Sequence, residues 1–331
     1  MGVNHLDTAH VYLRGKSEQV IGDVVERRGD RDKIIIGTKM RFNRDRKTHR
    51  FLLNGTDRQP AATPENLYKQ LELSLDRLRT DYIDILYLHS CYSPEMATFE
   101  PLMNALVKVK KQGKTRFIGI STHSNEPDVI RAAVDTGVYD VILTSYNFVQ
   151  KHRKEVKKAI QYAVDKGIGI VAMKTQGGGR LQRESKVGIN HTAALKWVLQ
   201  DENVCTSIPG MTSFDQLDLN FKTMNDLAIS SQEKADIIAA QAMNGIFYCQ
   251  NCRSCIPTCP KSVEIPHLIR AYMYAEGYGN PYQARNTIAE LPGKEGLDIC
   301  RSCTSCTAVC ANGIDISARI DFLIKSKYYL G

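Results

Sequence analysis

Short apolar runs alternate with amphipathic stretches along residues 1–243. The apolar runs are only a few residues long and lack the polar alternation of a strand with one solvated face, so they fit strands that are buried on both faces. Seven runs have this character: Val3–Leu6, Lys33–Thr38, Ile83–Leu88, Arg116–Ile120, Val141–Leu143, Gly169–Met173 and Val204–Ile208.

The stretches between these runs have the spacing of amphipathic helices. Thr63-Pro64-Glu65 is typical of a helix start, and Gly113, Gly137 and Gly167 follow three of the helical stretches. Ser230 and Glu233 form a capping box, which predicts a further helix before the cysteine-rich end of the chain. The other predicted helices are Glu18–Arg27, Pro64–Leu78, Glu100–Lys111, Pro127–Asp135, Lys154–Asp165 and Thr192–Leu199.

Strands that alternate with helices predict a parallel sheet in an α/β fold. The number and regularity of the units favour a TIM-type (β/α)8 barrel over an open sheet. Only seven strands are visible and the first begins at residue 3, so we expect the first βα unit to be missing and the barrel to stay open or to close in another way. The predicted domains are a barrel over residues 1–243 and a small α-helical domain over residues 244–331.

The composition fits a globular protein, because hydrophobic residues make up 43% and charged residues 24% of the chain. No apolar run approaches the ~20 residues that span a bilayer. The net charge of +8 is concentrated in Arg41–Arg50 and Lys151–Lys158. These clusters are either solvated surfaces or a docking face for an acidic electron carrier or a phosphorylated cofactor. We do not expect nucleic acid binding, because no recognition motif accompanies the charge.

Two cysteine runs near the C-terminus share the spacing C-x2-C-x2-C-x3-C. This spacing is typical of [4Fe-4S] clusters, and in two-cluster ferredoxins the fourth cysteine of each run binds the other cluster. The crossed pattern predicts one cluster on Cys249, Cys252, Cys255 and Cys310, and a second on Cys259, Cys300, Cys303 and Cys306. Structural zinc sites are the alternative, although zinc usually takes two C-x2-C pairs. A disulfide framework fits less well. Iron–sulfur chemistry predicts a reducing compartment, the cytoplasm.

The segment between the two runs, residues 260–299, reads as two short helices, 265–279 and 281–292. A separation of this length resembles an α-helical ferredoxin insert. The two remaining cysteines, Cys91 and Cys205, are expected to be buried in the barrel.

Four polar residues stand at or just after the ends of three consecutive strands, where the active sites of barrels lie. They are Asp7, Tyr12, Lys39 and His89. A lysine cation lowers the pKa of a nearby phenol, and an aspartate holds the lysine in place. A neutral histidine can orient a carbonyl oxygen beside that phenol. The set can therefore protonate an alkoxide as hydride reaches the carbon.

The segments GVNHLDTAHVY and GKSEQVIG resemble the signature of the aldo-keto reductases, and the family's catalytic tetrad maps onto these four residues. The resemblance extends to about residue 227, and with the cysteine runs the chain is similar to the iron–sulfur branch of that family. It implies a nicotinamide cofactor held by residues from the later strands and loops. These are Ser121, Thr122, Tyr146, Met173, Gly177, Gly178, Gly179, Gly210, Thr212, Ser213, Gln216 and Asn220.

Three positions differ from the pattern of the family. Leu143 replaces a glutamine, Met173 replaces an aromatic residue that stacks on nicotinamide, and Gln216 replaces an arginine that grips a 2′-phosphate. The choice between NAD and NADP therefore stays open. Gly167–Ala172 has the letters of a dinucleotide fingerprint, but it lies along a predicted strand and does not open a helix, so it is not one.

The sequence thus predicts an NAD(P)-dependent oxidoreductase of carbonyls or alcohols, with Tyr12 as acid and base. Two [4Fe-4S] clusters would carry single electrons to a ferredoxin-like partner. Because hydride moves two electrons at once and no flavin site is visible to bridge the two processes, a second hypothesis stands. In it the clusters are structural or sensory, and the barrel is an ordinary reductase or is impaired by truncation.

Overall fold

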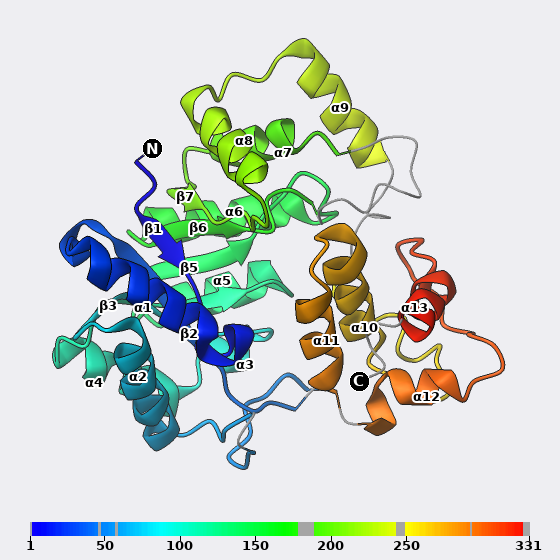
Figure 1. Ribbon diagram of the computed structural model, residues 1–331, viewed down its shortest axis with the longest axis horizontal. Coiled ribbons are helices and arrows are strands. Elements are labelled where there is room, and N and C mark those ends of the chain that lie inside the picture. Colours follow the sequence, from blue (N-terminus) through cyan, green and yellow to red (C-terminus); the bar gives the residue numbers. More distant parts are fainter. Residues whose placement is uncertain are drawn as a thin grey trace. The chain divides into compact units, whose positions relative to one another are not determined.

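Seven parallel strands form one sheet. The structure, a computed structural model, describes residues 2–45, 48–56, 59–177, 189–242, 249–291 and 293–326. Within these residues each strand pairs in parallel with the next in sequence, and β1 and β7 are the two edges (Figure 1). The strands are β1 (His5–Asp7), β2 (Ile35–Met40), β3 (Ile83–Leu88), β4 (Thr115–Thr122), β5 (Val141–Ser145), β6 (Gly169–Met173) and β7 (Thr206–Ser207).

Each strand lies on a predicted apolar run, and the predicted parallel α/β sheet is confirmed. β3 and β6 coincide with their runs, so the glycine-rich segment Gly167–Ala172 lies largely along a strand, as expected. β1 starts two residues later than predicted. The exposed side chain of Val3 explains this, because 61% of its surface remains open and it adds nothing to the core.

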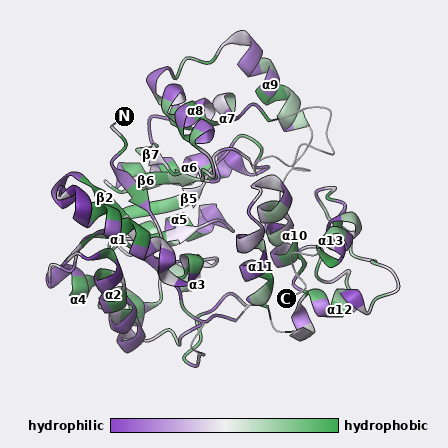
Figure 2. Cartoon of the chain, in the orientation of Figure 1, coloured by the Kyte–Doolittle hydropathy of each residue, from purple (hydrophilic) through white to green (hydrophobic). Residues whose placement is uncertain are grey.

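Helices connect the strands and end where their sequence signals predict. Thr63 accepts a hydrogen bond from the Asn66 amide and caps α2, and Gly113, Gly137 and Gly167 take positive φ just beyond α4, α5 and α6. Figure 2 shows β5 and β6 in the colour of hydrophobic residues, whereas α1, α2 and α4 mix both colours. These helices and short turns are η1 (Tyr12–Gly15), α1 (Lys16–Arg28), η2 (Arg31–Lys33), α2 (Pro64–Leu78), α3 (Pro94–Ala97), α4 (Glu100–Lys111), α5 (Glu126–Asp135) and α6 (Arg153–Asp165).

The chain divides into two compact units that interleave along the sequence. The first takes Met1–Ser145, Lys154–Met173 and Glu202–Ile208, and contains all seven strands. The second takes the remaining segments, including the cysteine runs. The boundary after residue 243 stays a prediction, but the last helices of the predicted barrel share a compact unit with the cysteines.

The second unit is helical. The two helices predicted between the cysteine runs are confirmed as α10, continued by the π-helical turn η3, and α11. Its helices are α7 (His191–Leu199), α8 (Phe214–Asn225), α9 (Ser231–Ala242), α10 (Ile265–Tyr272), η3 (Met273–Gly277), α11 (Pro281–Ala289), η4 (Gly293–Glu295), α12 (Leu297–Arg301) and α13 (Ile316–Lys325).

One apolar core runs through the second unit. Ala193 of α7 and Ile237 of α9 belong to the same buried cluster as Leu268 of α10 and Leu323 of α13. Cys255 is buried within this cluster. The cysteine runs therefore fold against helices that precede them in the sequence.

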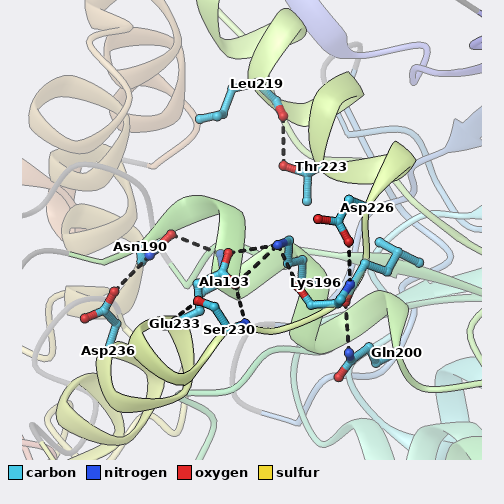
Figure 3. A network of polar contacts seen from close by, with 12 residues as sticks. Asn190, Ala193, Lys196, Gln200, Leu219, Thr223, Asp226, Ser230, Glu233 and Asp236 are labelled. Atoms are coloured by element: carbon cyan, nitrogen blue, oxygen red, sulfur yellow. Dashed lines mark hydrogen bonds and ion pairs between the residues drawn. The ribbon is translucent and has the colours of Figure 1, made fainter.

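Hydrogen bonds and an ion pair connect α7 to α9 (Figure 3). Lys196, only 7% exposed, donates to the Ala228 carbonyl at 2.8 Å and pairs with Glu233 at 3.0 Å. Glu233 also accepts from the Ser230 amide at 2.7 Å, while Ser230 Oγ accepts from the Glu233 amide at 3.1 Å, so the predicted capping box is confirmed. Because the buried ammonium needs both partners, the network fixes how α9 packs on α7.

We predict that Gly119→Ala in β4 destabilises the sheet, whereas Gly169→Ala in β6 does not. A Cβ at residue 119 would stand 2.2 Å from the Val141 carbonyl oxygen and 2.9 Å from the Tyr87 ring, whereas a Cβ at residue 169 would meet only atoms at 3.8 Å or beyond. Overpacking of this kind costs about 1–3 kcal/mol. Urea unfolding of both variants measures the difference, and equal midpoints would contradict this packing.

Candidate active site and cysteine clusters

The four candidate catalytic residues come together in the first unit. Lys39 Nζ lies 2.5 Å from Asp7 Oδ2, donates to the Thr8 carbonyl at 2.6 Å, and stands 5.0 Å from the centre of the Tyr12 ring. The rings of Tyr12 and His89 meet edge to face, with centroids 5.7 Å apart. The register explains the convergence, because Asp7 pairs with Gly37 across β1 and β2, and Lys39 pairs with Tyr87 across β2 and β3.

Burial sets the charge states of this group. Desolvation lowers the pKa of the Lys39 ammonium, and the charge of Asp7 and its hydrogen bond act against that shift. Burial also brings the pKa of His89 well below its usual value, with the Lys39 charge adding to the effect. His89 is therefore neutral at neutral pH, as its proposed role in orienting a carbonyl requires.

Two polar atoms of the group have no hydrogen-bond partner among the described residues. They are Oδ1 of Asp7 and Nδ1 of His89, both buried. A buried polar atom without a partner costs free energy unless another group satisfies it. The site thus keeps hydrogen-bonding capacity for a molecule that enters it.

A buried ion pair holds the segment that carries Tyr12. Glu18 of α1 is fully buried, accepts from the Thr38 hydroxyl at 2.7 Å and pairs with Arg77 of α2 at 3.2 Å. Arg77 also donates to the His10 carbonyl at 3.1 Å. Gly15 is needed beside it, because a Cβ there would lie 2.3 Å from the Arg77 guanidinium carbon and the residue has a φ of +91°.

Neither Glu18 nor Arg77 is among the site residues that the sequence predicts. A signal for Glu18 was present, because it shares the inward face of α1 with Gly22 and Val25, and an acidic side chain at a core-facing position needs a partner. No comparable signal marks Arg77, whose partners all come from distant parts of the sequence.

Three of the candidate cofactor residues lie in the first unit. Ser121 is buried at the end of β4, where its Oγ accepts from the Ser90 amide at 2.8 Å. Thr122 donates to the Ser124 carbonyl. Met173, at the end of β6, packs against a small buried cluster that includes Leu143 and Tyr87.

The remaining candidate cofactor residues belong to the second unit. The Tyr146 hydroxyl donates to Asp201 at 2.8 Å, and its ring packs on Trp197. Gly177 has a positive φ, and Gly178 and Gly179 fall outside the described residues.

The last candidate cofactor residues, from Gly210 to Asn220, lie just before α8 or within it. Ser213 caps the helix, and Gln216 Oε1 accepts from the Thr212 amide at 2.7 Å. Asn220 accepts from Gln176 at 2.9 Å, which ties α8 to the segment before Gly177.

The eight cysteines of the two runs gather in two groups. The pKa of the Cys255 thiol is raised to about 12 by burial, and the thiols of Cys249, Cys310 and Cys252 add to the rise. We call these four the first cysteine group. The pKa of Cys300 is likewise raised to about 12 by burial, with Cys259, Cys303 and Cys306 adding to it. These four are the second cysteine group. Each group takes its fourth member from the other run.

The donors around the first cysteine group fit an iron–sulfur cluster. Backbone amides of Asn251 and Asn312 donate to the sulfurs of Cys249 and Cys310, both at 3.3 Å. Bonds of this kind are characteristic of cluster thiolates. Within the described part of the chain, no set of three or more His, Cys, Asp or Glu side chains, the two cysteine groups included, is arranged to hold a single metal ion.

The two cysteines outside the runs differ from each other. Cys91 is fully buried as predicted, and burial raises its pKa to about 12. The expectation for Cys205 was wrong, because its side chain is exposed. It stands just before β7, a two-residue strand at the sheet edge, where a side chain is covered on few sides.

A parallel sheet with helices between its strands and a helical unit with two cysteine groups define a two-part α/β protein. Residues 1–192 match the aldo/keto reductase family, so the chain belongs to that family. Residues 248–315 match the 4Fe-4S dicluster domain.

Several known proteins are similar to parts of the chain. An aldo-keto reductase of Alternaria alternata is 28% identical over 55% of this chain and 54% of its own length, so the chain spans about half of that relative. L-galactose dehydrogenase of Arabidopsis thaliana is 24% identical over 73% of this chain and 80% of its own length. A holo aldo-keto reductase from Bacillus halodurans superposes with a TM-score of 0.56 at 24% identity, covering 72% of this chain and 83% of its own. None of the described helices is long and apolar enough to cross a membrane.

We predict that Arg77→Met destabilises the protein strongly, while Arg79→Met has little effect. Removing one partner of a buried ion pair costs about 3–5 kcal/mol, because the other charge stays buried. Arg79, two residues further on, makes only exposed pairs with Asp23 and Glu26. Denaturant titration checks this, and similar unfolding midpoints for the two variants would refute a role for Arg77 in holding the segment.

Proposed function

We propose that the protein is an NAD(P)-dependent oxidoreductase that reduces a carbonyl or oxidises an alcohol. The main support for this proposal is that four side chains meet at adjacent strand ends. They are Lys39, Asp7, Tyr12 and His89. Membership of the aldo/keto reductase family supports it. A related solved structure is described as a complex with NADPH and a curated relative as NADH-specific, so both cofactors occur among similar proteins.

When bound, NAD(P)H supplies hydride to the carbonyl carbon. The Tyr12 hydroxyl gives its proton to the carbonyl oxygen, and the product is the alcohol. Lys39, held by Asp7, favours the phenolate that remains and so makes Tyr12 a better acid. Neutral His89 orients the carbonyl oxygen beside the phenol. In alcohol oxidation the same groups act in reverse.

The two cysteine groups are proposed to bind two [4Fe-4S] clusters with crossed ligation. The interaction of Cys255 with Cys310, and of Cys300 with Cys259, supports this. An external one-electron carrier of the ferredoxin type would meet the second cysteine group, because residues 301–307 are all exposed. Thiolate ligation of iron is compatible with a reducing compartment such as the cytoplasm.

A structural role for the clusters is the second candidate. Cys255 lies in the core of the second unit, and Cys249, Cys259, Cys300 and Cys310 pack against that core. Loss of a cluster would then loosen helices that hold the candidate cofactor residues of α8.

We predict that Tyr12→Phe lowers carbonyl reduction by about 100- to 10,000-fold, the usual contribution of general acid catalysis. Tyr82→Phe is the matched control, because its ring stacks under Arg31 and phenylalanine keeps that contact. Steady-state kinetics with NADH and NADPH over a carbonyl panel measures the loss. The iron absorbance should be the same in both variants. Unchanged turnover in Tyr12→Phe would exclude it as the acid.

We predict that Cys249→Ser and Cys310→Ser disturb one cluster, and that Cys259→Ser disturbs the other. After anaerobic reconstitution, the first two variants should share one remaining paramagnetic signal that differs from the signal of the third. Cys205→Ser, at an exposed cysteine outside both groups, should keep both clusters. A shared signal in Cys249→Ser and Cys259→Ser would mean that ligation is not crossed.

The same cysteine variants distinguish an electron-transfer role of the clusters from a structural role. If carbonyl reduction survives while reduction of a one-electron dye is lost, the clusters carry electrons and are not needed for hydride transfer. If circular dichroism shows that helical structure collapses, the clusters are structural.

A further inference from the structure

Hydrogen bonds to cysteine sulfur are unevenly divided between the two groups. In the first cysteine group, Cys249 and Cys310 each accept from a backbone amide, and Cys252 accepts from the Ser254 hydroxyl and from the side-chain amide of Asn312, both at 3.6 Å. Throughout the described ranges, no hydrogen bond reaches a sulfur of the second cysteine group.

Asn312 makes two of these four bonds. Its backbone N–H donates to Cys310 and its Nδ2 to Cys252, a residue 60 positions away in the sequence. The turn that places it is closed by the Gly313 amide, which donates to the Cys310 carbonyl at 3.1 Å, and Gly313 has a φ of +80°. The side chain therefore links the two cysteine runs at the first cysteine group.

A donor that points at a thiolate sulfur stabilises negative charge on the cluster. Reduction adds one negative charge, so such donors favour the reduced state and raise the reduction potential. In the part of the chain that the structure describes, the second cysteine group accepts no hydrogen bond at sulfur and has two exposed members, Cys303 and Cys306, against Cys252 alone in the first, so its potential depends more on solvent.

We propose that Asn312 raises the reduction potential of the cluster held by the first cysteine group and so makes the two clusters inequivalent. This rests on the proposed binding of two clusters. Asn312 is a positioning residue in this role, because it acts through cysteine sulfurs and not on a substrate.

The test is a redox titration of the anaerobically reconstituted full chain, followed by paramagnetic resonance. Asn312→Ala removes the side-chain donor and should shift one of the two midpoint potentials to a lower value while the other stays unchanged. Asn312→Asp keeps the size of the side chain but turns a carboxylate oxygen toward the sulfur, so it should lower the same midpoint further. If the alanine variant loses iron, the midpoint potentials of Asn312→Asp still test the proposal.

Ser305→Ala is the matched control, because Ser305 also follows a cysteine by two residues but donates to no sulfur of the described residues. Both of its midpoints should equal those of the parent. Unchanged midpoints in both Asn312 variants, or equal shifts of both clusters, would overturn the inference. A parent protein whose iron content and spectra show fewer than two clusters would instead contradict the proposed function.

Discussion

The burial of the Lys39 ammonium is the constraint on which the strand-end site depends. An ammonium ion taken out of water costs several kcal/mol unless an opposite charge and hydrogen bonds compensate it. Asp7 and the Thr8 carbonyl supply that compensation, and both stand at the end of β1. The strand must therefore pair with β2 in the observed register, because a shift by one residue would turn Asp7 to the other face of the sheet. One ion pair thus holds an edge strand in place and positions a cation beside Tyr12, and its Lys39 charge adds to the burial that lowers the pKa of His89.

The second unit shows why the cysteine runs are more than an appended module. Helices that precede the first cysteine run share one core with helices that follow it, and the ion pair of Lys196 and Glu233 connects α7 to α9. Helix α8, with the candidate adenosine-side residues, is tied to the same unit through Asn220. Cys255 belongs to the same buried core as Ala193 of α7, and α7 packs against α8, so a proposed cluster ligand and the candidate cofactor residues of α8 are connected through packed helices.

Much of this architecture could be predicted from the sequence, because it follows from local patterns. The strands are runs of apolar residues, the helix ends are marked by Thr63, Gly113 and Ser230, and the tetrad stands at strand ends that the pattern locates. Features that depend on contacts between distant residues were not accessible. Arg77 meets its partners across the sequence, the exposure of Cys205 follows from the shortness of β7, and the bond from Asn312 to Cys252 joins segments 60 positions apart. The division into interleaved units arises from tertiary packing and has no local signal.

The number of electrons moved in each step limits how hydride transfer could be coupled to one-electron transfer by the proposed clusters. Hydride transfer moves two electrons in one step, whereas each cubane accepts one. Two clusters can hold two electrons only in succession, and the order is then set by their potentials. Identical clusters would give no preferred order, so a fixed order of reduction needs clusters with different surroundings. Among the described residues, the first cysteine group has hydrogen-bond donors to sulfur, one buried and one exposed member, whereas the second has two exposed members and no buried one. That difference would give the two proposed clusters a preferred order of reduction.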